Sequence, residues 1–535
     1  MKKKSFFKNG DPTKILLCAV FIAFVFYPFI RMVMNIEPDD ITRVFQSASF
    51  MPSLVMSLKA AITTTLISVS LGLTLAFFLQ RSRIKCKGLF TVLLILPMLI
   101  PSISHGMGLI VLFGANGILT KFLGLSGTIY GFTGMVVGSV LYSYPVSFLM
   151  FNDVLKYEDS SPYEAAQVLG IPKFNRLTAI TLPYLARPLI YAIFTVFTLV
   201  ITDYGIPLMI GGKNTTLAVM MYQEVLGQLD FGKGGVIGLL LLIPAVVTFV
   251  FNTFFKNNAK MGYVSKPFDI KKNFLRDAIA YIFCIAVVLC ILLMLVSFGL
   301  VAFTEKYPTD MSFTLDNMTK MFDRASDYLL NSVIIAACVS VIGVVTAFIT
   351  AYMTTRMKSA FSSVLHLFSI TSLAIPGLVL GLSYSMTFSG SFIYGTMAIL
   401  ILANLMHFFA SPYQMMYNSL SKMNENLENV GQTLGISRFR IVLDVIVPQS
   451  KSTIIEMISY FFVNSMMTIS AVSFLANTST KPISLMIGQY EAQNNYEYAA
   501  VISLIILVSN ILVKSIVYIV NRISAKRNAY VNPVK

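Results

Sequence analysis

The sequence predicts an all-α, polytopic membrane protein with about twelve transmembrane helices arranged in two six-helix halves. Of its 535 residues, 56% are hydrophobic, and the mean hydropathy is +0.76, well above that of a soluble domain. The apolar residues gather in runs of about 20, the length that a helix needs to cross the hydrocarbon core. A short polar motif also occurs twice, at equivalent places in the two halves.

The net charge of +16 does not require a nucleic acid partner. The basic residues lie at the ends of apolar runs, as the positive-inside rule describes, rather than on one face. The cysteines lie in or beside apolar runs without the spacing of metal ligands, so no disulfide framework, metal site or cofactor is predicted. They are Cys18, Cys86, Cys284, Cys290 and Cys338.

The first half is predicted to comprise residues 1–260, with six spans. Five lysines precede Ile15, which places the start of the chain in the cytoplasm. The first apolar run is long for a signal peptide and has no cleavage site after it, so we expect a retained helix. The basic cluster from Arg81 to Lys87 fixes the next loop on the same side. The expected spans are 15–34, 54–79, 89–113, 131–151, 184–206 and 234–256.

The second half is predicted to comprise residues 277–535, after a basic connector at 261–276. Six preceding spans and the charge of the connector place it in the cytoplasm, and the tail from Arg522 follows on the same side. Two halves of equal polarity favour a parallel repeat with a pore between them. The expected spans are 278–303, 329–353, 361–388, 393–417, 454–475 and 498–520.

Matching positions extend the repeat beyond the short motif. Pro101 and Pro376 lie 275 residues apart, whereas Gly170 and Gly435, within the motif, lie 265 apart. The second half is therefore about ten residues shorter between its third span and its motif.

Each copy of the motif is predicted to form a two-turn helix. In the first copy, Ser161 is placed to cap the helix, Glu164 to bond back to the cap, and Gly170 to end the helix in a left-handed conformation. A helix this short is unstable alone and needs a surface to pack against. In the second copy, Asn426 takes the cap position and Gly435 the stop, and Glu428 puts a negative charge in the first turn. Our hypothesis is that Glu428 replaces Glu164 one position early.

The sequence Glu164-Ala165-Ala166, followed by Gly170 and closed by Pro183, resembles the EAA loop of binding-protein-dependent ABC importer permeases. In that family the loop forms a coupling helix that docks into a cleft of the ATPase subunit. The loops would cover about 152–188 and 418–453. The second copy departs from the pattern, because its only glutamate comes one position early. The resemblance implies that coupling involves Glu164, Ala165, Ala166, Gly170, Pro183, Glu428, Asn429, Gly435 and Pro448.

The sequence contains no phosphate-binding loop. The stretch from Gly211 to Thr215 is faintly similar, but Pro207 stands at the first glycine and Asn214 at the hydroxyl residue. The chain is therefore not predicted to be an enzyme. The resemblance implies two separate ATPase subunits carrying ATP and Mg²⁺, an extracytoplasmic solute-binding protein, a small-molecule solute and a place in the bacterial plasma (inner) membrane.

Prolines and glycines interrupt the third and ninth spans, notably at Pro101 and Pro376. Such breaks occur where helices pack tightly or line a cavity, and both interpretations stay open. Asp203, inside the fifth span, either marks a pathway or caps a helix that restarts after Gly205. The predicted solute-pathway residues are Ser102, His105, Asp203, Tyr204, Tyr384, Ser470 and Ser473.

The stretch from Asp203 to Pro207, with Gly211-Gly212, resembles fused permeases for 2-aminoethylphosphonate. Ser470-Ala471-Val472 is similar to the same group and to ferric-iron permeases. The resemblance implies an ATP-driven importer permease for 2-aminoethylphosphonate or a related phosphonate, with ferric iron or a polyamine as alternatives. An ion-driven secondary transporter is a different class, but it needs paired intramembrane charges, and Asp203 lacks an evident basic partner. No nucleophile and base constellation supports a membrane-bound enzyme.

Overall fold

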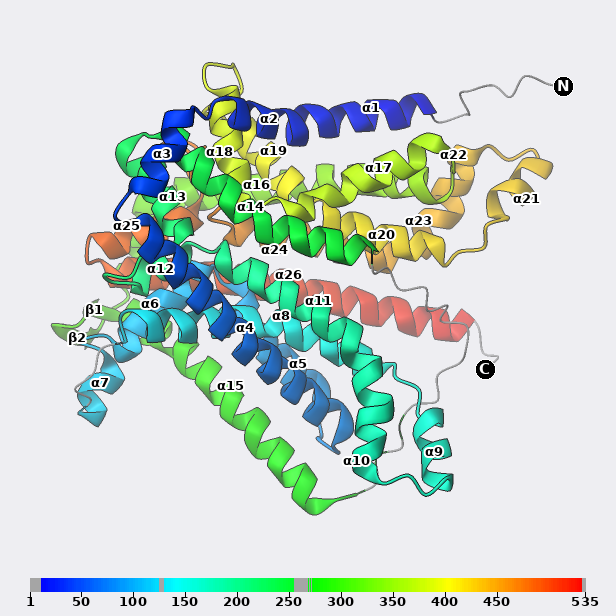
Figure 1. Cartoon of the computed structure of the whole chain (residues 1–535). Coiled ribbons are helices and arrows are strands. Elements are labelled where there is room, and N and C mark those ends of the chain that lie inside the picture. Colours follow the sequence, from blue (N-terminus) through cyan, green and yellow to red (C-terminus); the bar gives the residue numbers. More distant parts are fainter. Residues whose placement is uncertain (1–10, 125–128, 255–267, 269, 271, 532–535) are drawn as a thin grey trace.

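The computed structural model describes residues 11–124, 129–254, 268, 270 and 272–531, and these are almost entirely helical (Figure 1). The lysines before residue 11 and most of the predicted connector, 261–276, lie outside the described residues. Within the described residues, nine helices are long and apolar enough to cross a membrane. The pair Ala360–Ala374 and Gly377–Phe388, bent by 105°, makes a tenth candidate.

We call residues 11–254 the N-half. It is helical throughout, with π-helical turns at η1 and η3 and a 3₁₀ turn at η2. Its elements are α1 (Asp11–Phe21), η1 (Ile22–Phe26), α2 (Tyr27–Met34), α3 (Pro38–Gln46), α4 (Phe50–Arg81), α5 (Lys87–Ile95), η2 (Leu96–Leu99), α6 (Ser102–Phe113), α7 (Ile118–Leu123), α8 (Phe132–Lys156), α9 (Ser161–Val168), α10 (Lys173–Arg176), η3 (Leu177–Thr181), α11 (Leu182–Ile201), α12 (Gly205–Ile210), α13 (Leu217–Gln228) and α14 (Phe231–Phe254).

We call residues 272–531 the C-half. It adds one short antiparallel hairpin, β1 and β2, to the helices. Its elements are α15 (Phe274–Ala302), β1 (Thr304–Lys306), β2 (Asp310–Phe313), α16 (Asp316–Thr355), α17 (Ala360–Thr371), η4 (Ser372–Ala374), α18 (Gly377–Phe388), α19 (Met397–Phe408), α20 (Ala410–Ser421), α21 (Leu427–Thr433), α22 (Arg438–Ile441), η5 (Val442–Ile446), α23 (Val447–Gln449), α24 (Lys451–Met467), η6 (Ile483–Leu485), α25 (Met486–Ala492) and α26 (Tyr496–Val531).

Five of the twelve predicted spans are not single helices. The third and ninth break where Pro101 and Pro376 precede α6 and α18, because proline lacks the amide that would continue the helix. The tenth divides into α19 and α20 at Phe409, three residues before Pro412. The fifth, predicted to reach residue 206, is helical only to Ile201, and α12 begins separately at Gly205. The eleventh, predicted to reach residue 475, is helical only to Met467. The all-α membrane architecture is confirmed, and these five segments are shorter or bent.

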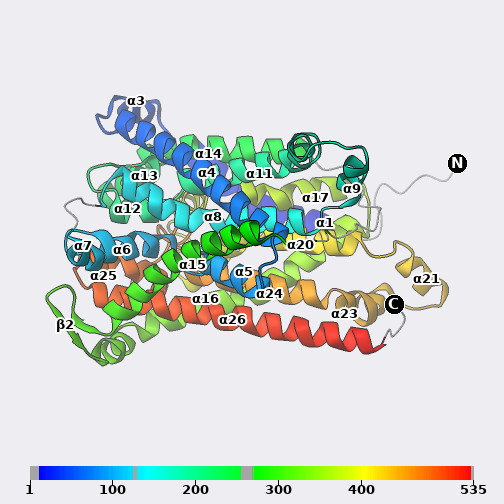
Figure 2. The ribbon, with the colours of Figure 1, turned by 90° about the horizontal axis from the view of Figure 1, so that it is seen from below.

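The long helices run between two ends of the molecule (Figure 1). One end carries α9, α10, α21 and α22, together with the start of α1 and the last turns of α26; the other carries α7, the hairpin and α25. Figure 2 shows the same separation from below. We call the first the predicted cytoplasmic end and the second the predicted outer end, following the charge pattern of the sequence.

Each half contributes its first helix to the other half. Phe21 of α1 packs edge-on against Phe409 of the C-half, with ring centroids 5.1 Å apart. Phe283 of α15 packs in the same manner against Phe78 of α4, at 5.5 Å. The buried apolar residues form two clusters, and each includes residues of the other half's first helix. The halves are therefore interlocked rather than side by side.

Aspartates at the start of these exchanged helices fix their predicted cytoplasmic ends. Ser359 Oγ donates to Asp11 Oδ1 at 2.6 Å, and Lys14 Nζ donates to Ser359 Oγ at 2.7 Å. In the other exchange, the Arg83 amide donates to Asp277 Oδ1 at 3.1 Å. The loop after the second long helix of each half thus binds the first helix of the other half.

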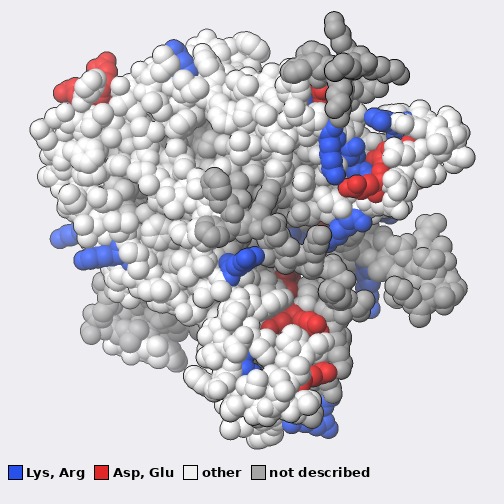
Figure 3. Space-filling view, turned by 45° about the vertical axis from the view of Figure 1, so that its right-hand side comes forward, with Lys and Arg blue, Asp and Glu red and all other residues white. Residues whose placement is uncertain are grey.

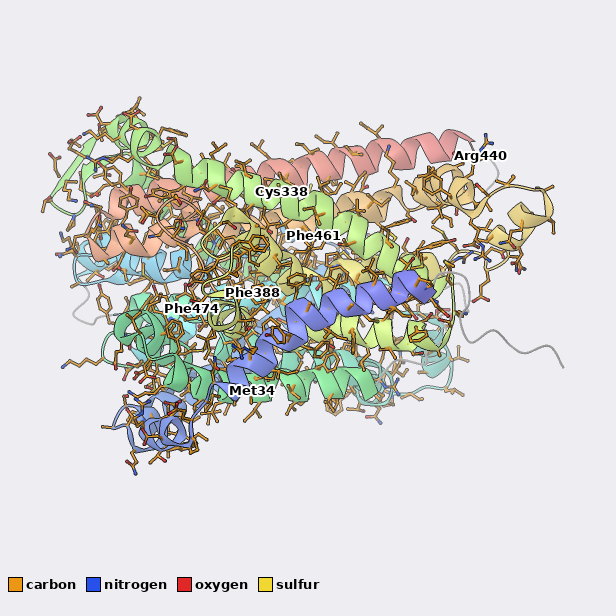
Figure 4. All side chains as sticks on the ribbon, turned by 90° about the horizontal axis from the view of Figure 1, so that it is seen from above. Met34, Cys338, Phe388, Arg440, Phe461 and Phe474 are labelled. Carbon is orange, nitrogen blue, oxygen red and sulfur yellow. The ribbon has the colours of Figure 1, made fainter. Side chains whose placement is uncertain are left out.

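Helix packing within the C-half is close. A Cβ placed at Gly343 of α16 would lie 2.6 Å from the ring of Phe461 on α24. Phe461 lies inside the bundle in Figure 4, whereas Arg440 lies at the predicted cytoplasmic end. Glycine at this position lets the two helices approach, a common device in membrane proteins.

Candidate functional site

The short helix α9 forms where the motif predicts it, with a different cap. Ser160 is the N-cap residue, and its Oγ donates to Glu164 Oε1 at 3.1 Å. Asp159 Oδ1 accepts from the Ser161 amide at 3.1 Å. The prediction that Ser161 is the cap is therefore wrong, because Asp159 and Ser160 provide the local side-chain bonds one residue earlier. In the second copy, Asn426 is the N-cap residue but makes no capping bond.

Both short helices end as predicted. Gly170 and Gly435 adopt φ values of +70° and +73°, in the left-handed region that glycine accepts without strain. After each glycine, the next amide donates to the carbonyl five residues earlier, the Schellman arrangement that satisfies the last turn of a helix. These pairs are Ile171 with Ala166, at 3.0 Å, and Ile436 with Gly431, at 2.9 Å.

The short helices expose apolar side chains at the predicted cytoplasmic end. Leu169 is 76% exposed and Leu434, its repeat partner, 70%. A second matched pair, Phe174 (73% exposed) and Phe439 (74%), was not predicted, although these residues also lie 265 apart. Figure 3, which brings this end forward, shows the two loops as separate projections. Large apolar side chains exposed at matched places mark an interaction surface.

The predicted coupling residues do not all face outward. Glu164, Ala165 and Asn429 are exposed, whereas Ala166 is buried against the chain itself. Ala166 therefore supports the helix from behind and does not offer a docking side chain. Pro183 and Pro448 lie in the first turns of α11 and α23, directly after the π-helices η3 and η5, where a missing amide costs little.

An arginine at the end of α4 anchors the first short helix. The Arg81 guanidinium pairs with Glu158, and Arg81 Nη1 donates to the Leu155 carbonyl at 3.2 Å. Tyr163, in the first turn of α9, donates its hydroxyl to Glu158 Oε1 at 2.6 Å. The Phe268 ring covers Arg81, with 3.7 Å between its centroid and Cζ. The helix is thereby joined to α4 through one buried carboxylate.

Arg356 anchors the second short helix with a carboxylate from the helix itself. Arg356 Nε donates to Glu428 Oε1 at 2.8 Å, and Nη2 donates to Oε2 at 2.5 Å. Glu428 is only 8% exposed. By the repeat offset it stands at the position of Tyr163. The hypothesis that Glu428 replaces Glu164 one position early is therefore wrong: Glu428 faces inward, and Asn429 occupies the exposed position.

At the interface between the halves, Asp203 caps a short helix. Its Oδ2 accepts from the Ile206 amide at 3.1 Å, at the start of α12, and the Ser102 hydroxyl donates to the same carboxylate. Of the two interpretations of Asp203, capping describes this structure. The next residue crosses the interface: Tyr204 Oη lies 2.6 Å from Ser473 Oγ, and its ring stacks on Tyr222.

A serine and a glycine exchange places between the halves at this interface. A Cβ at Gly205 would lie 2.5 Å from Ser102 Oγ, and a Cβ at Gly377 would lie 2.4 Å from Ser470 Oγ. Ser102 corresponds to Gly377 at the offset of 275, and Gly205 corresponds to Ser470 at 265. Each broken helix therefore meets its partner segment through one serine and one glycine, in opposite order.

The structure separates the remaining predicted pathway residues. His105 is buried, with Nδ1 3.2 Å from the Pro101 carbonyl and its ring against Tyr142. Tyr384 lies elsewhere, because its hydroxyl donates to the Phe24 carbonyl at 2.5 Å and so holds the exchanged N-terminal helix. Around the breaks, a Cβ at Gly106 would lie 2.7 Å from Met209. Tight packing thus describes the broken helices in this conformation.

The described residues do not form a group of metal ligands. Within these ranges no three His, Cys, Asp or Glu side chains gather as metal ligands would. The polar groups at the interface are hydroxyls, an imidazole and one carboxylate on apolar walls, and these groups donate and accept hydrogen bonds.

Comparison with known proteins gives a family match over most of the chain. Residues 68–307 and 340–525 match the binding-protein-dependent transport system inner membrane component. The ferric transport system permease protein FbpB of Actinobacillus pleuropneumoniae is 24% identical over 524 residues, covering 93% of this chain and 76% of that protein. The Fe(3+)-transport system permease protein FbpB 2 of Haemophilus influenzae is 21% identical over 493 residues, covering 90% and 92%.

One solved structure is also similar. It is a bacterial alginate ABC transporter in complex with an alginate pentasaccharide-bound periplasmic protein. That chain matches 47% of this one and 94% of its own length, with 18% identity and a TM-score of 0.37.

Proposed function

Since the chain belongs to the family of binding-protein-dependent transport system inner membrane components, present in two fused copies, we propose that it carries ferric iron across the bacterial inner membrane. In this proposal both pore halves lie in one polypeptide. Two separate ATPase subunits hold α9 and α21, and an extracytoplasmic binding protein delivers the solute to the predicted outer end.

The observation that carries the coupling role is the pair of short helices with matched exposed side chains. Leu169 and Leu434, with Phe174 and Phe439, form two apolar surfaces at one end of the molecule. Each helix is joined by an arginine to a long helix of its own half, α4 or α16. Movement of the ATPase subunits would therefore reach these helices directly.

The transport step would use the interface of the halves. The conformation described here is closed around Asp203 and Tyr204, because the serine and glycine pairs pack tightly. We propose that ATP binding draws the two short helices together and separates these contacts, which opens the interface toward the binding protein. Hydrolysis would restore the packed state.

Ferric iron is favoured over phosphonate as the solute because the full-length relatives are ferric permeases. FbpB of Actinobacillus pleuropneumoniae matches 93% of this chain, whereas the resemblance to phosphonate permeases depends on short stretches around Asp203 and Ser470. Metal specificity would come chiefly from the binding protein, since the interface offers one carboxylate and neutral groups.

Cellular uptake would test the proposal. A strain without this chain should lose accumulation of radioactive ferric iron and regain it with the wild-type chain. Uptake of 2-aminoethylphosphonate by the same strains serves as the control. Loss of phosphonate uptake with normal iron uptake would reverse the assignment of the solute. Unchanged uptake after removal of the ATPase subunit would contradict ATP-driven import.

A further inference from the structure

A groove opens on the flank of the molecule where α15 of the C-half lies against α4 of the N-half. It has a volume of about 500 Å³. Its walls are apolar apart from two hydroxyl groups, one of which, Thr74 Oγ1, donates to the Ser70 carbonyl at 2.7 Å. The residues that line it are Leu66, Ile67, Ser70, Leu71, Thr74 and Phe283.

The groove lies at the depth of lipid acyl chains. Thr74 and Leu66 precede Arg81 by seven and fifteen residues on α4, or about 10 and 22 Å along the helix axis. One leaflet of the hydrocarbon core is about 15 Å thick. The groove therefore begins below the headgroup level on the predicted cytoplasmic side and follows the helices inward.

Basic side chains gather at the end of the groove that faces the predicted cytoplasm. Arg81, Lys87 and Arg276 lie close enough that the two arginines, after burial, lower the pKa of Lys87. Arg81 pairs with Glu158 and Arg276 with Asp277. For the side chains of Arg83, Lys85 and Lys87, the described residues provide no carboxylate partner. Asp277 also acts on Lys87 and raises its pKa, but within the described ranges the three side chains have no ion-pair partner.

The loop that carries these three residues is held in place. The Arg83 amide donates to Asp277 Oδ1 at 3.1 Å, and the Lys85 amide donates to Tyr281 Oη at 2.6 Å. Both acceptors belong to α15, which forms the other wall of the groove. The basic loop and the groove are therefore parts of one preorganised surface.

The equivalent place in the C-half is neutral. There Arg356 pairs with Glu428, Lys358 with Glu425 at 3.0 Å, and Lys14 with Asp11 at 3.2 Å. The general bias for basic residues in cytoplasmic loops applies to both halves, so it does not account for the difference. An external anion at the N-half loop does.

We propose that this surface is a binding site for one anionic phospholipid, with its phosphate headgroup on Arg83, Lys85 and Lys87 and an acyl chain in the groove between α4 and α15. Basic pockets between transmembrane helices recognise anionic lipids in this way. The lipid would lie in the groove between α4 and α15, where α15 packs against the N-half. A neutral lipid fills the groove but leaves the three charges unmatched.

Native mass spectrometry of the full-length chain, purified in detergent, tests the site. Titration with dioleoylphosphatidylglycerol should give one tightly retained lipid, and dioleoylphosphatidylcholine should bind more weakly. The triple variant Arg83→Gln, Lys85→Gln, Lys87→Gln should bind phosphatidylglycerol at least about tenfold more weakly. The control triple Lys358→Gln, Lys422→Gln, Lys451→Gln removes the same charge elsewhere and should bind normally. Equal loss in both triples overturns the site.

A second variant tests the groove without changing any charge. Ser70→Phe places a ring among the lining side chains, so retention of phosphatidylglycerol should fall several-fold while the basic loop stays intact. Native Cys86, exposed between Lys85 and Lys87, gives an independent readout that does not depend on the variants. Phosphatidylglycerol should slow its alkylation by a maleimide.

Inorganic phosphate separates a lipid from a free anion. If phosphate alone protects Cys86 as well as phosphatidylglycerol does, and Ser70→Phe has no effect, the lipid site is refuted and the loop binds a free anion. Protection that requires the acyl chains supports the lipid.

Discussion

At the scale of single residues, the serine and glycine exchange predicts an unusual double variant. In Gly205→Ser, the new serine side chain would enter the space that Ser102 Oγ already fills. Overpacking of this kind costs about 1–3 kcal/mol. Adding Ser102→Gly should recover part of that loss, because the pair then reproduces the arrangement of Gly377 and Ser470, although the new side chain still lies against Ile103 and Ile469. Thermal unfolding of the detergent-purified chain, followed by circular dichroism, measures both.

The control for this pair is Ser102→Gly alone, which creates no clash but removes the hydroxyl that donates to Asp203. If the double variant is no more stable than Gly205→Ser, the equivalence of the two contacts is wrong. The sequence alone did not reveal this relation, because the two positions carry different offsets and unlike residues. The distances in the structure were needed to pair them.

At the scale of elements, substitutions at the end of each short helix should affect coupling to the ATPase without preventing the bundle from folding. Gly170→Ala should cost about 1–2 kcal/mol locally, since φ of +70° is strained for a residue with a Cβ. Nothing lies within 4 Å of the new Cβ, so the bundle should fold normally. We expect several-fold less ATP-dependent uptake at an unchanged amount of folded protein. Gly170→Asp should uncouple further.

Gly88→Ala is the matched control for these variants. Gly88 lies in α5, is equally free of neighbours and has no positive φ, so alanine there should leave uptake unchanged. Normal uptake by Gly170→Ala and Gly435→Ala would show that the helix stop is not needed for coupling.

The arginine anchors give a second prediction for elements. Arg356→Gln leaves the buried Glu428 carboxylate without its cation, at a cost of about 2 kcal/mol or more. The second change Glu428→Gln should restore part of the stability and of the binding to the ATPase subunit. Co-purification of that subunit is the measurement. No recovery in the double variant would mean that Arg356 stabilises α21 through the backbone carbonyls of the loop before it and not through Glu428.

The elements were largely predictable, and their details less so. Helical periodicity and prolines predicted the breaks at Pro101 and Pro376, and glycine chemistry predicted both helix stops. The inward turn of Glu428 was not predictable, because one polar residue on a short helix fits either face until its partner, Arg356, is placed. The same holds for Ala166, whose small side chain suits a groove or a core.

At the scale of the whole molecule, the exchanged first helices predict that the halves assemble as separate chains. Fragments 1–260 and 261–535, produced together, should co-purify, because α1 covers the C-half and α15 covers the N-half. A first fragment that lacks residues 1–34 removes one exchange and should retain several-fold less of the second fragment. Equal retention would contradict the interlocked arrangement.

The repeat in the sequence predicted two halves but not their exchange. Apolar periodicity identifies the face of a helix that must be covered and says nothing of what covers it. Phe21 and Phe283 could have packed within their own halves without any change in the pattern of the sequence. Only the three-dimensional contacts with Phe409 and Phe78 decide the matter.

The exchange also sets an order of events during synthesis. α1 leaves the ribosome long before Phe409, which emerges nearly 400 residues after the Phe21 that packs against it. At 5–20 residues per second, that interval is roughly 20–75 s. Until Ser359 emerges, the buried pair of Lys14 and Asp11 lacks the hydroxyl that bonds to both, and α1 lies in the lipid without its final neighbours. α1 therefore reaches its final place only after synthesis has passed Phe409.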